Sequence, residues 1–220
     1  MFGLLNSSPL TFFIYILSLL IAITVHEFAH AKVADTLGDP TPRLQGRLSL
    51  NPLVHLDPVG TLMLLIVGFG WGKPVMFDPF NLSRPIRDAA LISFAGPGSN
   101  FVVALFLSIL LKLSIFFKLQ ALITIGYFFV PIIILNVVLG VFNLLPISPL
   151  DGFKVVGGFL SHEKAQEWYQ LERYGILFLI ALLLPIGPGQ QSMLSFIIEP
   201  AIRFVLSFLL PMGIASSGIL

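Results

Sequence analysis

The sequence predicts an all-α polytopic membrane protein with about 5–6 transmembrane or re-entrant segments. Of the 220 residues, 56% are hydrophobic and only 10% are charged, and the mean hydropathy is +0.97. A water-soluble fold would have too little polar surface for such a composition. Four uncharged stretches are each at least as long as the roughly 20 residues that cross hydrocarbon as a helix. They are residues 1–25, 89–111, 119–150 and 174–198.

The first helix is expected to run from about Pro9 to Thr36, because residues 38–40 read Gly-Asp-Pro, a sequence that favours a loop. A polar connector follows over residues 38–58. The next apolar stretch, residues 59–71, is short for a membrane crossing and leads into a glycine-rich segment. We therefore expect a re-entrant or hairpin loop near residues 59–75.

The later spans are interrupted at definite places. Residues 89–111 form a span near whose start lies Ala-Gly-Pro-Gly, a run of small residues that permits close helix packing or a local break. Residues 121–145 form another span, which stops at two prolines just before Asp151. A charged segment, residues 154–173, then lies outside the hydrocarbon, and C-terminal helices are expected within residues 174–212.

These segments are interpreted as a single membrane-embedded domain over residues 1–220, with a catalytic core at about residues 10–160, since no internal repeat or separate soluble unit is visible. Glu199 and Arg203 are four residues apart near the C-terminus, so we expect them to pair on one helical face. Met1–Leu10 carries no Lys or Arg, so we expect the first segment to be retained rather than cleaved.

Charge and cysteine content exclude several classes. The net charge is +1 with interspersed signs, so nucleic acid is not a predicted partner. Because the chain has no cysteine, any metal must be held by histidine and carboxylate groups. If the chain starts outside and residues 59–72 re-enter, nine of the 12 Lys and Arg residues fall in the cytoplasm, as expected for a multi-pass cell-membrane protein.

Residues 26–30 carry the pattern H-E-x-x-H on a strongly apolar helix. Four residues make about one helical turn, so His26 and His30 project from one face as two aligned zinc ligands. Glu27 lies about 100 degrees around the axis and can reach a metal-bound water as a general base. Chance is a weak alternative, because three such groups in a membrane helix cost several kcal/mol unless they serve a site.

A catalytic zinc needs a third protein ligand, for which the sequence offers His55, His162 or an acid. Asp151 is the best candidate, because the prolines before it expose backbone at membrane depth, which is tolerated where it lines a protein cavity. The alternative is an ordinary Asp-Gly turn. The first and fourth segments both run inward, so Asp151 and His30 are expected at the same depth, near the cytoplasmic side.

Three motifs resemble those of the site-2 protease family of intramembrane metalloproteases: H-E-x-x-H at residues 26–30, A-G-P-G-S-N at residues 95–100 and N-L-L-P-I-S-P-L-D-G at residues 143–152. Residues 51–58 are similar to a segment of small members that lack a PDZ domain. The resemblance covers about residues 10–160. It implies one Zn²⁺ per chain, a catalytic glutamate, and substrates that are single transmembrane helices of other membrane proteins in the lipid bilayer.

The ligands that this resemblance implies are His26, His30 and Asp151, with Glu27 as the catalytic acid. Ser148 departs from the motif, which often has Pro there, but the prolines on either side remain.

Further substrate-binding groups are less determined by the sequence. A substrate helix must unwind locally, and the segment from Gly68 through Gly70 to Val75 is the candidate edge for the extended peptide, with an ordinary glycine-rich turn as the alternative. Candidates for stabilising the transition state are Asn100, Asn143 and His55, and each could instead satisfy broken-helix backbone. The oligomeric state stays open, a homo-oligomer included.

The predicted function is zinc-dependent hydrolysis of peptide bonds within or near transmembrane helices. The main alternative is a divalent-metal transporter or channel, which predicts polar residues spread across the membrane. Here the predicted ligands gather at one depth instead. A structural zinc site is a third alternative, but it does not need Glu27 beside the metal.

Overall fold

The computed structural model describes residues 7–67, 70–126, 128–187 and 191–211, and this part of the chain is helical without a β-strand. Three helical stretches in it are long and apolar enough to cross a membrane, which confirms the all-α polytopic class. They are α2 (Pro9–Thr36), α5 (Pro85–Phe116), and α6 (Gln120–Gly126) taken together with α7 (Phe129–Asn143).

The shorter elements connect these helices or follow them. In chain order they are α3 (Thr41–Leu44), a 3₁₀ turn (Pro52–Val54), α4 (Pro58–Val67), a second 3₁₀ turn (Pro79–Asn81), α8 (Asp151–Phe159), α9 (His162–Tyr169), α10 (Glu172–Leu183) and α11 (Met193–Leu209). Helix α2 has the predicted bounds. Helix α5 extends beyond the predicted 89–111 at both ends. Its early start is explained by Pro85, because proline is well suited to a first helical turn.

Helix α4 and the segment after it form the expected re-entrant loop. Leu56 and Gly72 pair in an isolated antiparallel bridge, so the chain returns to the level from which α4 started. A side chain at Gly60 would collide with the backbone of Trp71, which shows how closely the returning segment packs on the helix. The predicted substrate edge is not a regular strand here, since only Gly72 makes a bridge within the described residues.

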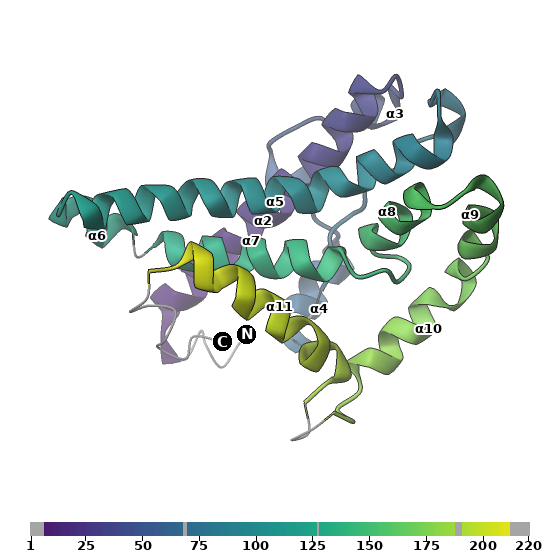
Figure 1. Cartoon of the computed structure of the whole chain (residues 1–220). Helices are drawn as coiled ribbons and strands as arrows, with labels where there is room; N and C mark the ends of the chain where they lie inside the picture. Colours follow the sequence, from purple (N-terminus) through teal and green to yellow (C-terminus); the bar gives the residue numbers. More distant parts are fainter. Residues whose placement is uncertain (1–6, 68–69, 127, 188–190, 212–220) are drawn as a thin grey trace.

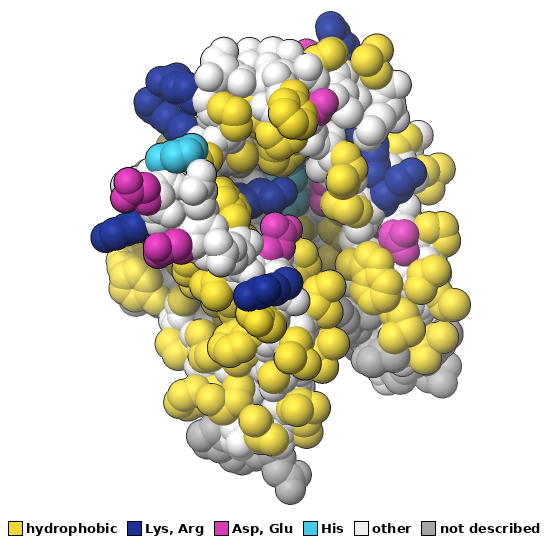
Figure 2. Space-filling model, turned by 90° about the vertical axis from the view of Figure 1, so that its right-hand side faces the viewer, with side chains coloured by type: hydrophobic (Ala, Val, Ile, Leu, Met, Phe, Trp, Pro, Cys, Tyr) yellow, Lys and Arg dark blue, Asp and Glu magenta, His cyan; other side chains and the backbone are white. Residues whose placement is uncertain are grey.

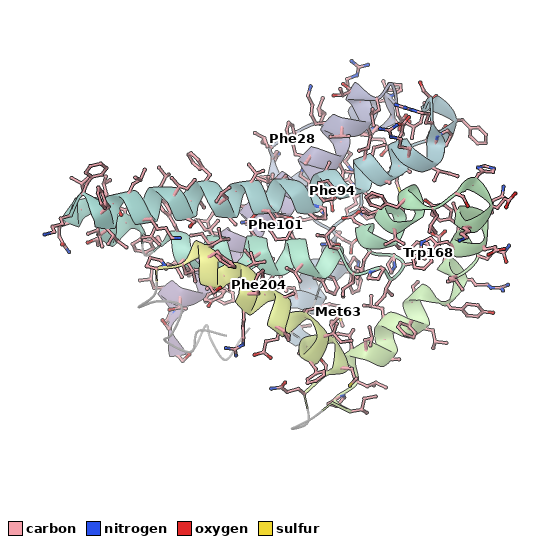
Figure 3. The ribbon with its side chains drawn as sticks, viewed as in Figure 1. Phe28, Met63, Phe94, Phe101, Trp168 and Phe204 are labelled. Atoms are coloured by element: carbon pink, nitrogen blue, oxygen red, sulfur yellow. The ribbon has the colours of Figure 1, made fainter. Side chains whose placement is uncertain are left out.

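The core forms where α5, α7 and α11 pack together. Ala104, Ile133 and Val137 are fully buried there. Figure 1 shows α5 and α7 running alongside each other, with α8, α9 and α10 at one end. Phe101 of α5 lies between these two helices (Figure 3), and a side chain at Gly140 of α7 would approach its ring to 3.0 Å.

Helix α11 is fixed to α5 by polar contacts as well as by apolar packing. Ser108 and Lys112 of α5 donate hydrogen bonds to the carbonyl oxygens of Leu209 and Phe208. The predicted pairing of Glu199 with Arg203 is confirmed, with Arg203 Nε 2.8 Å from Glu199 Oε1.

Charged and apolar side chains are separated along the molecule. Lys, Arg, Asp and Glu gather around a hollowed end, whereas apolar side chains cover the flanks (Figure 2). On those flanks Phe13, Val102 and Phe204 are 63%, 67% and 66% exposed. Water would disfavour such a surface and hydrocarbon would not, so the protein is a membrane protein whose charged end projects from the apolar layer.

A buried carboxylate joins the end of α2 to the segment before α5. Asp39 accepts hydrogen bonds from the hydroxyl and backbone N–H of Thr41, from the side chain of Asn81 and from the backbone N–H of Asp78, at 2.6 to 3.1 Å. Burial alone would raise its pKa, but these hydrogen bonds hold the pKa of Asp39 below its ordinary value.

Asp39 therefore stabilises the fold at a pH above its unfolded-state pKa of about 3.9, and this contribution is lost as the pH falls through the lower folded-state value. We expect Asp39→Asn to lower the free energy of unfolding by about 1–3 kcal/mol near neutral pH. Thermal unfolding in detergent at a series of pH values would measure this. A variant that loses as much stability on acidification as the native chain would contradict the assignment.

Candidate metal centre

Two histidines of α2 and an aspartate more than 100 residues later in the sequence meet at one point. His26 and His30 lie one turn apart on α2, with their Nε2 atoms 3.0 Å from each other. Asp151 is the first residue of α8, and its Oδ2 lies 3.1 Å from Nε2 of His26 and 3.2 Å from Nε2 of His30. Both histidines are buried. The structure thus brings together the two histidines and the aspartate that the sequence singled out.

A hydrogen bond on the far side of each ring places a hydrogen on the Nδ1 atom of both histidines. His26 Nδ1 is 2.7 Å from Asn100 Oδ1, and His30 Nδ1 is 2.7 Å from the carbonyl oxygen of Ile92. Both of these oxygens can only accept, so Nδ1 must carry the hydrogen in each ring. In the neutral rings both Nε2 atoms then present lone pairs.

The resulting cluster fits a metal ion. When both rings are neutral, two imidazole lone pairs and a carboxylate oxygen converge, an arrangement that is repulsive unless a cation lies at the centre. A tetrahedral zinc with bonds of about 2.0–2.1 Å places its ligand atoms about 3.3 Å apart, close to the observed separations. Nitrogen and carboxylate donors are also ligands that zinc accepts.

Asn100 holds His26 from behind and is itself held by α7. Its side-chain amide donates to the carbonyl oxygen of Ala22 at 2.9 Å and to Oδ1 of Asn136 at 2.8 Å. Asn136 donates in turn to the carbonyl oxygen of Ile132 at 2.8 Å. This chain of hydrogen bonds sets the amide orientation of Asn100, so its oxygen faces the imidazole.

The helices can approach this closely because Gly96 faces the cluster. A Cβ atom there would lie 2.6 Å from Cε1 of His30 and 2.7 Å from Cε1 of His26. Gly152 has the corresponding role beside Asp151, since a Cβ atom there would overlap the carbonyl oxygen of Leu144. The proline-rich turn before α8 can therefore fold tightly and bring Asp151 to the histidines.

The outer face of α8 is fixed by aromatic packing. Trp168 of α9 points toward α8 (Figure 3), with its ring stacked on Phe153 at 4.9 Å between centroids. Its Nε1–H also donates to the carbonyl oxygen of Phe153 at 2.8 Å. These contacts restrain the helix that begins with Asp151.

Glu27 is bound to the returning segment of the re-entrant loop. Its Oε2 accepts a hydrogen bond from the backbone N–H of Val75 at 3.1 Å. Within the described residues its Oε1 accepts none, so one carboxylate oxygen is available beside the cluster.

Arg47, which the sequence reasoning did not single out, holds that segment in place. It is only 3% exposed, and its guanidinium donates to the carbonyl oxygens of Val54, Lys73 and Pro74. The backbone N–H of Lys73 also donates to the carbonyl oxygen of His55 at 2.8 Å. A lone arginine in a polar connector resembles a surface residue, so no local signal would have revealed this role.

The other predicted site residues have different surroundings. Both amide hydrogens of Asn100 are used, so it has no donor for a substrate oxyanion. His55 is fully buried and donates through Nε2 to the carbonyl oxygen of Ser49, while its Nδ1 has no partner in the described part of the chain. That nitrogen is an acceptor and cannot stabilise an oxyanion. Asn143 donates one amide hydrogen to the carbonyl oxygen of Leu139, and its other amide hydrogen has no acceptor among the described residues.

Two predicted edge residues complete the comparison. Gly68 lies outside the described residues. Gly70 packs against α4, where a Cβ atom would approach Cβ of Leu64 to 2.7 Å, so in this structure it permits close packing of the loop. His162 is exposed on α9 beside Gln166 and takes no part in the cluster.

Buried ligand atoms of this kind, with a carboxylate beside them in a bundle of apolar helices, are the arrangement expected of a membrane-embedded metal-dependent enzyme. The chain belongs to peptidase family M50. The model of this family, described as "Peptidase family M50", matches residues 112–185. That range includes Asp151. The resemblance to site-2 proteases is thereby confirmed.

Relatives match most of the chain. "Putative zinc metalloprotease YwhC" of Bacillus subtilis (strain 168) is 39% identical over 185 residues, which are 81% of this chain and 84% of the relative. "Putative zinc metalloprotease Rip2" of Mycolicibacterium smegmatis is 31% identical over 179 residues, covering 79% and 67%. The protein of the same name from Mycobacterium tuberculosis strain H37Rv is 30% identical over 171 residues, covering 75% and 64%. No solved structure gives a significant match.

If Asn100 orients His26, Asn100→Ala should lower the affinity for Zn²⁺ by about 10–100-fold. Asn100→Asp keeps an acceptor for the Nδ1 hydrogen and should recover part of that loss. Competition with a chelator would measure the affinities, with Asn143→Ala as the control because Asn143 does not contact either histidine. Native affinity in a folded Asn100→Ala variant would contradict this role.

Arg47→Ala should free the returning segment, because several carbonyl oxygens lose a charged donor at once. We expect amide exchange at Lys73 and Val75 to quicken on the order of ten-fold or more. Arg47→Lys should not restore protection, since an ammonium lacks the planar fork. The matched control is Arg43→Ala, which removes only an exposed arginine paired with Asp35. Equal protection in native and Arg47→Ala chains would exclude the role.

Proposed function

We propose that this protein is an intramembrane zinc-dependent endopeptidase that hydrolyses peptide bonds within or near the transmembrane helices of membrane-protein substrates. The observation that carries the proposal is the convergence of two imidazoles and a carboxylate, three possible zinc ligands, beside Glu27 within a bundle of apolar helices. Membership of a peptidase family and the printed names of the relatives support the same reaction class.

In this proposal, His26, His30 and Asp151 hold one zinc ion per chain. Zinc would supply a Lewis acid that polarises the peptide carbonyl and lowers the pKa of bound water to about 7. Glu27 accepts the proton of the attacking water at Oε1 and delivers it to the departing amine. The hydrogen bond from Val75 engages Oε2 and leaves Oε1 available for this proton transfer.

The reacting group of a substrate helix is hidden in its own hydrogen bonds, so the helix must unwind before attack. Residues 73–75 are held by Arg47 and bonded to Glu27, and within the described residues the carbonyl oxygen of Val75 is left unpaired and can accept a hydrogen bond from the unwound peptide. Asn143, which uses only one amide hydrogen within the described residues, is the remaining candidate for stabilising the oxyanion.

The proposed location is the cell membrane, with the active site toward the cytoplasm. Asp151 begins the helix that leads into the charged end of the molecule, and His30 lies less than two helical turns from the end of α2. Water for hydrolysis would enter from this hollowed end. The excess of Lys and Arg in the connectors there supports a cytoplasmic orientation.

A divalent-metal transporter is the competing function, but the polar groups deeper than the cluster argue against it. Asn100 and Asn136 are fully buried and bonded to each other and to backbone. A path for ions needs polar atoms along its length that are available to coordinate an ion.

Glu27→Gln should retain zinc but lower the rate of cleavage of a reconstituted membrane substrate by about 10²–10⁴-fold, because the general base is lost. Asp151→Ala should instead lose zinc, as measured by metal content. Glu163→Gln, the same exchange on an exposed part of α9, is the matched control and should leave the rate unchanged. Undiminished cleavage by Glu27→Gln would remove the mechanism, and zinc uptake into sealed vesicles would favour the transporter.

A further inference from the structure

A pocket of about 280 Å³ lies beside the returning segment of the loop. One wall is formed by Val75, Met76 and Phe77, and the facing wall by Ile86 and Ala89 in the first turns of α5. Lys154 and Tyr169 also line it. The pocket therefore joins the loop, α5, α8 and α9.

The pocket adjoins the catalytic groups on two sides. Val75 lines it and donates its backbone N–H to Glu27. Lys154, which lines it from α8, comes three residues after Asp151 and so lies about one helical turn away. A peptide whose scissile bond lies at the metal cluster would thus place a neighbouring side chain at the pocket.

The backbone at the pocket is open to pairing. Within the described residues the carbonyl oxygen of Val75 makes no hydrogen bond, and Met76 is 60% exposed. This carbonyl lies in the same residue as the N–H that donates to Glu27, so a backbone N–H of an extended peptide can donate to it. Alternate side chains of an extended peptide point to the same face. The edge supplies the register and the pocket receives one side chain.

The walls select for an apolar side chain. Val75, Phe77, Ile86 and Ala89 present hydrocarbon to the cavity. Lys154 lies over the ring of Phe77 with its Nζ 4.7 Å from the centroid, which keeps the ammonium against one wall. A basic side chain entering here would lose water and would find no carboxylate among the described lining residues.

We propose that this pocket is the specificity pocket of the enzyme and takes a large apolar side chain of the peptide substrate, within about two residues of the cleaved bond. This inference rests on the proposed function. Lys154 and Tyr169 belong to α8 and α9, at the charged end of the molecule. A lipid tail is a less suitable occupant, because it would have to leave the hydrocarbon layer to reach this pocket.

The test uses the full-length protein in lipid vesicles and a panel of transmembrane substrates. Each carries Ala, Leu, Phe or Trp at one position near the cleaved bond, and initial rates give the preference for large over small residues. Ala89→Phe fills the pocket and should lower the Phe-to-Ala rate ratio on the order of ten-fold. Ile86→Ala enlarges it and should move the preference from Phe toward Trp.

The matched control is Val102→Phe, which adds an aromatic ring to the lipid-facing side of the same helix and should leave the ratios as in the native chain. If Ala89→Phe does not fold, Ile86→Ala alone decides by the opposite shift. Unchanged ratios in folded pocket variants, with cleavage still dependent on Glu27, would overturn the pocket and leave the peptidase standing. Absence of cleavage by the native chain would instead refute the proposed function.

Discussion

The convergence of two imidazole rings and a carboxylate at one buried point is the constraint on which this structure depends. Hydrogen bonds to Asn100 and Ile92 place the ring hydrogens of His26 and His30 away from Asp151. The fold therefore holds a site that favours a cation, at a depth where an unpaired charge would be costly. Close packing around it follows from the same need, since Gly96 lets α5 reach the histidines that α2 presents.

The polar interior of the bundle is organised around this site. His26, Asn100 and Asn136 link α2, α5 and α7 through hydrogen bonds, and both amide hydrogens of Asn100 are used in this network. Such a network in an apolar core is stable when every member has partners. It also directs the lone pair of His26 toward the cluster, so the stability of the bundle and the geometry of the proposed metal site have one origin.

On the charged end, the loop and α8 form the proposed substrate side of the enzyme. Arg47 fixes residues 72–75 from one side, and Glu27 contacts the same segment through Val75. Within the described residues the carbonyl oxygen of Val75 in this segment is unpaired, and the apolar pocket lies next to it. Catalytic base, peptide edge and side-chain pocket would thus share one short stretch of backbone, so the position of a peptide on the edge would set which bond faces Glu27.

The sequence by itself determined the membrane class, the bounds of the first helix, and the motif that puts two histidines on one helical face, because hydropathy and helical period are local properties. It also ranked Asp151 above His55 and His162. Only the tertiary structure decided what lies between distant segments. Asn100 lies behind His26 with both amide hydrogens used, and Arg47 became a buried clamp. Hydrogen-bond partners at those positions come from residues remote in the chain, and no local pattern encodes them.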